Sequence, residues 1–141
     1  MYSFIFITHG NLGQTLLNVA SNIMDVDISD RTEFFSIEFS MTAELDDMKS
    51  NLEKVIENFS NKGHNVIIFV DIFGGSPSNI ALSLAKKENV DVISGVNLSM
   101  VMYGIEHRND DNDLNSMVSD IIRSSRQNII SAKQLLEQRG L

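Results

Sequence analysis

The sequence of 141 residues contains no cysteine, a single proline and no long apolar run. Without cysteine the chain forms no disulfide, no thiolate nucleophile and no cysteine-ligated metal site, which fits a reducing compartment. The scarcity of proline and the lack of any low-complexity tract exclude a disordered or collagen-like chain. The apolar run at residues 2–7 is too short for a membrane span, and no basic stretch precedes it. We therefore expect a cytoplasmic protein.

Basic side chains are also scarce. Lysine and arginine number 11 against 19 aspartates and glutamates, so the formal net charge is -8. A surface of this sign repels a phosphate backbone, and nucleic acid is not an expected partner. The length suits one ordinary domain with one hydrophobic core, so we expect residues 1–141 to form a single domain.

Four strand-like segments alternate with helix-like segments along the chain. Continuous apolar runs predict strands at 2–7 and 66–70 that are buried on both faces, while alternation at 35–39 predicts an edge strand. A fourth strand is predicted at 90–96. Apolar residues recur with helical spacing after each strand, at residues 12–24, 45–59, 76–87 and 98–105. This alternation predicts an α/β fold with three layers, in which a mainly parallel sheet of strand order 2-1-3-4 is flanked by helices.

The sequence also indicates where helices begin. Asn11, Thr42 and Ser76 are predicted N-caps, the last followed by the proline that suits the first helical position. After an acidic loop, residues 114–122 again have helical spacing. Residues 127–132 contain paired isoleucines and fit either a helix or a short strand.

In a parallel sheet, ligands bind beyond the carboxyl ends of the strands. The first strand ends at His9 and the third at Asp71, and these strands are neighbours in the predicted order. A histidine titrates near neutrality, although a lone histidine in a turn is usually only solvated. If Asp71 accepts a hydrogen bond from one ring nitrogen of His9, the other nitrogen keeps its lone pair for attack. The pair therefore predicts a nucleophilic histidine.

The turn that follows Asp71 suits a phosphate group. Gly74 and Gly75 let the main chain approach a ligand, and Ser76 offers a hydroxyl at the start of a helix whose N–H groups and dipole attract anions. In isolation such a turn is an ordinary strand-to-helix connection. Beside His9 and Asp71 it predicts a histidine that accepts a phosphoryl group.

The remaining histidines and the acidic loop are not predicted sites. His64 precedes the third strand and His107 follows the fourth helix, and both are expected on the surface, neither with a paired carboxylate and a glycine turn beside it. The acidic residues of the loop lack the glycine and glutamate of an EF-hand and are expected to be solvated: Asp110, Asp111 and Asp113. We expect no metal ion and no cofactor.

Three motifs together resemble the IIA domain of the mannose family of the bacterial sugar phosphotransferase system. They are Thr8-His9-Gly10, residues 70–79 (VDIFGGSPSN) and residues 93–100 (ISGVNLSM), and they occur in that order over essentially the whole chain. The resemblance implies that His9 takes a phosphoryl group from the carrier HPr and passes it to a IIB component. It also implies that Asp71 orients the ring of His9 and that Ser76 lies beside the phosphate.

The resemblance further implies where the chain works. The IIB component phosphorylates sugar during uptake, so the membrane components IIC and IID are reached indirectly, with the chain at the periphery of a transporter complex. The sugar is not specified, because a IIA domain contacts proteins and phosphate rather than sugar. No segment resembles a linker and IIB domain, so we expect a separate IIB protein. Ser78 departs from the family pattern, which usually has a large apolar residue there.

Members of this family are homodimers that exchange a strand near the C-terminus, which favours a strand at 127–132. A second subunit would then cover four apolar residues: Ile129, Ile130, Leu135 and Leu136.

Partners are expected to contact an apolar rim around His9, formed by loops and first helical turns at one sheet edge: Leu12, Phe73, Ser78, Leu98 and Met100. The acidic remainder of the surface would steer a partner that presents basic residues. The alternative to a phosphocarrier is a regulatory module that senses phosphorylation, or a phosphotransfer subunit of a dihydroxyacetone kinase, because mannose-type IIA domains also occur in those settings.

Overall fold

The computed structural model describes residues 1–29, 33–40 and 44–140. Its four strands form one parallel sheet in the order β2-β1-β3-β4. The strands are β1 (Tyr2–His9), β2 (Phe34–Phe39), β3 (Asn65–Val70) and β4 (Val90–Ser94). The predicted α/β class and strand order are confirmed, as is the edge position of β2. The fourth strand ends two residues earlier than predicted.

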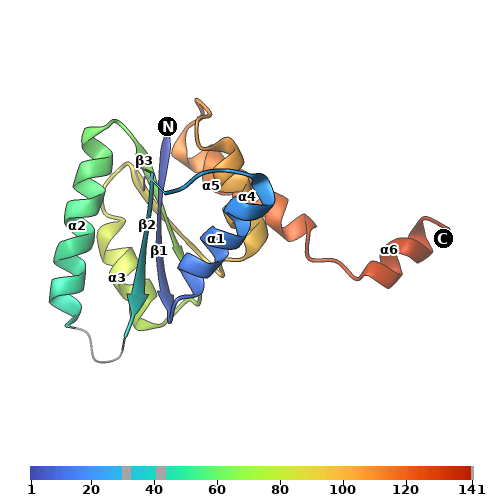
Figure 1. Ribbon diagram of the computed structural model, residues 1–141, viewed down its shortest axis with the longest axis horizontal. Helices are drawn as coiled ribbons and strands as arrows, with labels where there is room; N and C mark the ends of the chain where they lie inside the picture. Colours follow the sequence, from blue (N-terminus) through green and yellow to red (C-terminus); the bar gives the residue numbers. More distant parts are fainter. Residues whose placement is uncertain (30–32, 41–43, 141) are drawn as a thin grey trace.

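Helices cover both faces of the sheet (Figure 1). One layer contains α1, α4 and α5, and the other contains α2 and α3. The helices are α1 (Leu12–Met24), α2 (Leu45–Asn61), α3 (Ser76–Leu84), α4 (Leu98–His107), α5 (Leu114–Gln127) and α6 (Ala132–Gln138). No helix in the described parts of the chain is both long and apolar enough to cross a membrane.

The central strand β1 contributes to a core on each side of the sheet. Phe4 and Phe6 belong to the cluster that includes residues of α1, α4 and α5, while Ile5 and Ile7 belong to the cluster that includes residues of α2 and α3. All four are at most 1% exposed. Such burial of alternate residues on opposite faces explains why the strand is apolar throughout. The two clusters hold β1 rigidly, so the residue at its carboxyl end has a fixed position.

Two predicted helix caps differ in detail. Asn11 occupies the N-cap position of α1, but the capping hydrogen bond comes from Thr8, whose Oγ1 accepts the N–H of Gly13 at 2.8 Å. The N-cap of α3 is Gly75, one residue before the predicted Ser76. The cap predicted at Thr42 lies outside the described residues.

The C-terminal segment contains no strand. Helix α5 continues to Gln127, residues 128–131 are neither helix nor strand, and α6 then extends away from the body of the molecule (Figure 1). Ile129 and Ile130 in this connection are 76% and 59% exposed. The strand favoured for 127–132 is therefore not formed in the single chain, because no strand of the described chain pairs with the segment.

Candidate functional site

His9 and Asp71 meet at the carboxyl edge of the sheet. His9 is the last residue of β1, and Asp71 follows the last residue of β3, which is aligned with β1. Asp71 Oδ2 accepts a hydrogen bond from the main-chain N–H of His9 at 2.8 Å and lies 2.9 Å from His9 Nδ1. Because an ionised carboxylate only accepts, the proton of the neutral ring is on Nδ1. The other ring nitrogen, Nε2, therefore carries the free lone pair.

The environment keeps Asp71 ionised. Burial raises the pKa of this carboxyl group, but three groups together lower the pKa by more than burial raises it. They are the main-chain N–H of His9, the His9 ring and the main-chain N–H of Ile72. The last of these donates to Asp71 Oδ1 at 2.9 Å. The net result is a pKa below the usual aspartate value, so Asp71 carries a full negative charge beside the imidazole at neutral pH.

The glycine turn lies against the His9 ring. A Cβ atom placed on Gly75 would be 3.8 Å from His9 Cε1, so the start of α3 closely approaches the imidazole. Gly74 has a φ of +92°, a left-handed conformation that favours glycine. Ser76 is the first residue of α3 and is exposed. The site thus combines a ring nitrogen with a free lone pair, a carboxylate bonded to the same ring and the positive end of a helix.

Residues 3–122 match the family model EIIA-man, described as the PTS system fructose IIA component. The chain belongs to this family. The description of this family names a component of the phosphotransferase system (PTS).

A curated relative supports this membership of the EIIA-man family. The mannose-specific EIIAB component of Escherichia coli strain K12 is 30% identical over 90 residues. The matched segment is 59% of this chain and only 28% of that protein.

Solved structures of similar proteins share the fold. The EIIA component of Streptococcus agalactiae superposes with a TM-score of 0.81 at 23% identity, over 95% of this chain and 99% of that one. The PTS IIA protein associated with the fucose utilization operon of Streptococcus pneumoniae gives a TM-score of 0.77 at 20% identity, over 96% of this chain and 99% of that one.

Only part of the predicted apolar rim is exposed in this EIIA-man family member. Leu12 is 42% exposed and Phe73 is 72% exposed. Leu98 is partly buried against the core. Met100 is only 9% exposed and belongs to the core, so its predicted place on the rim was wrong. Ile72, which was not predicted to lie on the rim, is 57% exposed and precedes Phe73 in the chain.

Ser78 was also wrongly placed on the rim. It is 1% exposed, and its Oγ accepts the N–H of Gly74 at 2.9 Å and donates to the carbonyl of Gly75 at 3.0 Å. The hydroxyl of Ser78 therefore shapes the glycine turn from inside. The tendency of serine to bond nearby main-chain groups at helix starts was the sequence signal for this role.

His64 is buried, contrary to its predicted place on the surface. Its residue exposure is 8%, and its Nδ1 lies 2.6 Å from Ser3 Oγ. This hydroxyl satisfies the ring nitrogen, which explains why the otherwise apolar start of β1 has a serine at its second position.

His107 is partly exposed, in agreement with its predicted surface position, and it has a carboxylate beside it. Its Nδ1 is 2.7 Å from Asp110 Oδ2, and its ring stacks on Tyr103 at a centroid distance of 4.1 Å. It lacks the glycine turn that accompanies His9. Within the described residues, no three histidine, aspartate or glutamate side chains are grouped to hold a metal ion.

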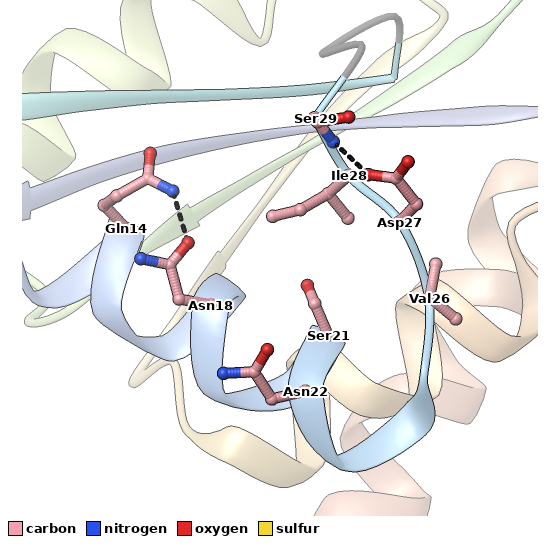
Figure 2. Close-up of a pocket in the computed structure, with 8 residues that line it drawn as sticks. All are labelled: Gln14, Asn18, Ser21, Asn22, Val26, Asp27, Ile28 and Ser29. Carbon is pink, nitrogen blue, oxygen red and sulfur yellow. Dashed lines mark hydrogen bonds between the residues drawn. The ribbon is translucent and has the colours of Figure 1, made fainter.

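A separate hollow of about 410 Å³ lies between α1 and residues 26–29. Figure 2 shows a hydrogen bond from the side chain of Gln14 to that of Asn18 on one side of the hollow. On the other side, the main-chain N–H of Ser29 donates a hydrogen bond to the carboxylate of Asp27. None of the residues lining it is a predicted site residue.

Proposed function

We propose that His9 accepts a phosphoryl group from phosphorylated HPr and passes it to a IIB component during sugar uptake. The observation that carries this proposal is the pair of hydrogen bonds from His9, main chain and ring, to the same oxygen of Asp71. In the first step, the Nε2 lone pair attacks phosphorus, and the bond between phosphorus and the donor breaks with its electron pair leaving on the donor. In the second step, the IIB nucleophile attacks the same phosphorus and the imidazole of His9 leaves.

The surrounding groups suit this transfer, which depends on alignment and charge stabilisation. Phosphorylation at Nε2 makes the ring cationic while Nδ1 keeps its proton, and the ionised Asp71 stabilises that cation. The start of α3 and the hydroxyl of Ser76 provide a positive dipole and a donor for the phosphoryl oxygens. In this proposal, Gly74 and Gly75 keep the main chain close to the ligand.

The open position of His9 suits donors that are themselves proteins. Its side chain is 51% exposed, and the exposed apolar residues Leu12, Ile72 and Phe73 occur in the loops and helix start at this edge. We propose that these three residues form the docking rim. The contact is small and weak, because each partner must leave after one transfer. The formal charge of -8 favours partners with basic surfaces.

We also propose that two chains form a homodimer through the C-terminal segment. Strand β4 pairs only with β3 among the described strands, so its other edge is available. A hollow of about 320 Å³ beside it includes Ser94, Ile122 and Ser125 in its lining. The hydroxyl of Ser125 is buried and has no hydrogen-bond partner among the described residues. Residues 128–131 of a second copy would cover this edge and bury Ile129 and Ile130.

The test of the phosphocarrier role is labelling with phosphoenolpyruvate in the presence of enzyme I and HPr. We expect one acid-labile, base-stable phosphoryl group per chain, and none in His9→Ala. The matched control is His107→Ala, which removes a second histidine that has a carboxylate partner and should label as the wild type does. Stoichiometric labelling of His9→Ala would refute the assignment.

A further inference from the structure

The His9 ring has a second neighbour, on the β2 flank of β1, whereas Asp71 is on the β3 flank. Phe39 is the last residue of β2 and is aligned with His9 across the β1–β2 ladder. The two ring centroids are 5.5 Å apart with an interplanar angle of 71°, which is an edge-type contact. Because β2 and β3 are the two neighbours of β1, the imidazole lies between an aromatic ring and a carboxylate.

The hydrogen bond to Asp71 does not by itself fix the ring. It restrains one atom, Nδ1, while the outer torsion of a histidine side chain is broad and the side chain of His9 is half exposed. The ring can therefore tilt about that atom and move Nε2. A contact from the opposite side limits the tilt.

Phe39 is itself rigid enough to impose that limit. It is only 7% exposed and belongs to the core cluster that includes Ile7 and Met48. A packed aromatic side chain has few alternative positions, whereas a surface aromatic would move with the imidazole.

We propose that Phe39 is a positioning residue that holds the imidazole of His9 against Asp71 and keeps Nε2 in one place for the incoming phosphorus. The consequence for phosphoryl transfer rests on the proposed function. The consequence for the imidazole does not, because it concerns the free protein.

The experiment compares Phe39→Leu with Phe39→Tyr and with the control Phe35→Leu. Phe35 lies four residues earlier in β2 and packs against the same core cluster. Its substitution therefore reports the effect of losing an aromatic side chain from β2 without the contact to His9. Nitrogen-15 NMR of the His9 ring is expected to show a dominant Nδ1–H form in the wild type. In Phe39→Leu the two nitrogen shifts should move toward those of a free imidazole, while Phe39→Tyr and Phe35→Leu retain the wild-type shifts.

Transfer kinetics give the second measurement. In Phe39→Leu we expect kcat to fall about fivefold, with KM for HPr unchanged, since an edge contact between rings is a modest interaction. If Phe39→Leu does not fold, Phe39→Met answers the same question with a more flexible side chain. Wild-type nitrogen shifts in a folded Phe39→Leu, or equal shift changes in Phe35→Leu, would overturn the proposal. A wild-type protein that takes no phosphoryl group would instead refute the proposed function, and the nitrogen shifts would still decide the role of Phe39.

Discussion

At the scale of single residues, Asp71 holds the imidazole of His9 in position and places a negative charge beside it. Its Oδ2 accepts from the main chain and the ring of His9, and its Oδ1 accepts from Ile72. The two oxygens of Asp71 thus connect the end of β1 with the turn that follows β3. A change at this residue alters the ring without removing an apolar contact.

Asp71→Asn should fold normally and transfer phosphoryl groups at least about tenfold more slowly, because a neutral amide forms a weaker hydrogen bond to a cationic ring than a carboxylate does. Rapid-quench kinetics with phosphorylated HPr measure the rate. The matched control is Asp110→Asn, which removes the charge from the other histidine–aspartate pair and should leave the rate unchanged. A wild-type rate in Asp71→Asn would remove Asp71 from the mechanism.

His64 makes stability depend on pH. Burial lowers its pKa from the ordinary 6.5, helped by the N-terminal amine and Lys62 and opposed by Glu33. Just below pH 6.5, His64 is therefore protonated more often in the unfolded state than in the native state. The neutral, buried ring contributes its full stabilisation above pH 6.5, and the free energy of unfolding decreases as the pH falls from 6.5 toward the lower native pKa. Urea unfolding across this range should show a shallower pH dependence for His64→Gln than for the wild type. His107→Gln is the control, and equal slopes for the wild type and His64→Gln would contradict the expectation.

These residues also show what the sequence could and could not predict about the site. His9 and Asp71 were predictable because the carboxyl ends of adjacent parallel strands meet at one edge, a rule that depends only on strand order. Ser78, His64 and Met100 were misplaced because their burial depends on the direction of each side chain after the helices pack. Polarity alone gave no signal of that direction for Ser78 and His64, since both are satisfied by specific hydrogen bonds inside the protein.

At the scale of elements, the approach of α1 to the sheet determines where the His9 loop lies. The first turn of α1 packs so closely that a Cβ atom on Gly13 would be 2.6 Å from Phe6 Cβ and 3.2 Å from Thr8 Oγ1. The helix therefore lies directly against β1, and Thr8 caps it just before the chain reaches His9.

Gly13→Ala should destabilise the protein by about 1–3 kcal/mol, because the added methyl group forces α1 away from the sheet. Chemical denaturation measures the loss. Asn22→Ala on the exposed side of the same helix is the control and should change stability by less than about 0.5 kcal/mol. If Gly13→Ala were as stable as the control, the helix would not be held at the distance described.

The elements themselves were largely predictable, with one informative exception. The strands and the first five helices follow from apolar runs and helical spacing. Residues 127–132 gave an ambiguous pattern, and the single chain leaves Ile129 and Ile130 exposed in a connection. The conformation of this segment was not predictable from local sequence because it depends on what covers it.

At the scale of the whole molecule, that exposed segment leads to a prediction about assembly. Light scattering at micromolar concentration should give twice the chain mass of 15.8 kDa. Ile130→Asp should shift the protein toward the monomer, because a charge would be buried at the proposed contact, while Ile23→Asp on the exposed face of α1 should not. A wild-type monomer that transfers phosphoryl groups at full rate would contradict the homodimer.

The docking rim gives a second prediction at this scale. Phe73→Asp should impair transfer from HPr through a higher KM while leaving the melting temperature nearly unchanged, because Phe73 is 72% exposed. The control is Leu82→Asp, an equivalent change at an exposed position farther along α3. Normal transfer by a folded Phe73→Asp variant would place the docking surface elsewhere.

The position of β1 between β2 and β3 has a consequence for protein synthesis. β1 is made before both of its neighbours, and its hydrogen bonds to β3 are completed only once residue 70 has been added. Until then the nascent chain carries an almost wholly apolar strand with at least one open edge, the kind of segment that associates with other chains. The central position of β1, which fixes the place of His9 in the folded protein, therefore exposes the growing polypeptide to aggregation until β3 has been made. Rapid synthesis or chaperone binding would protect the chain during that interval.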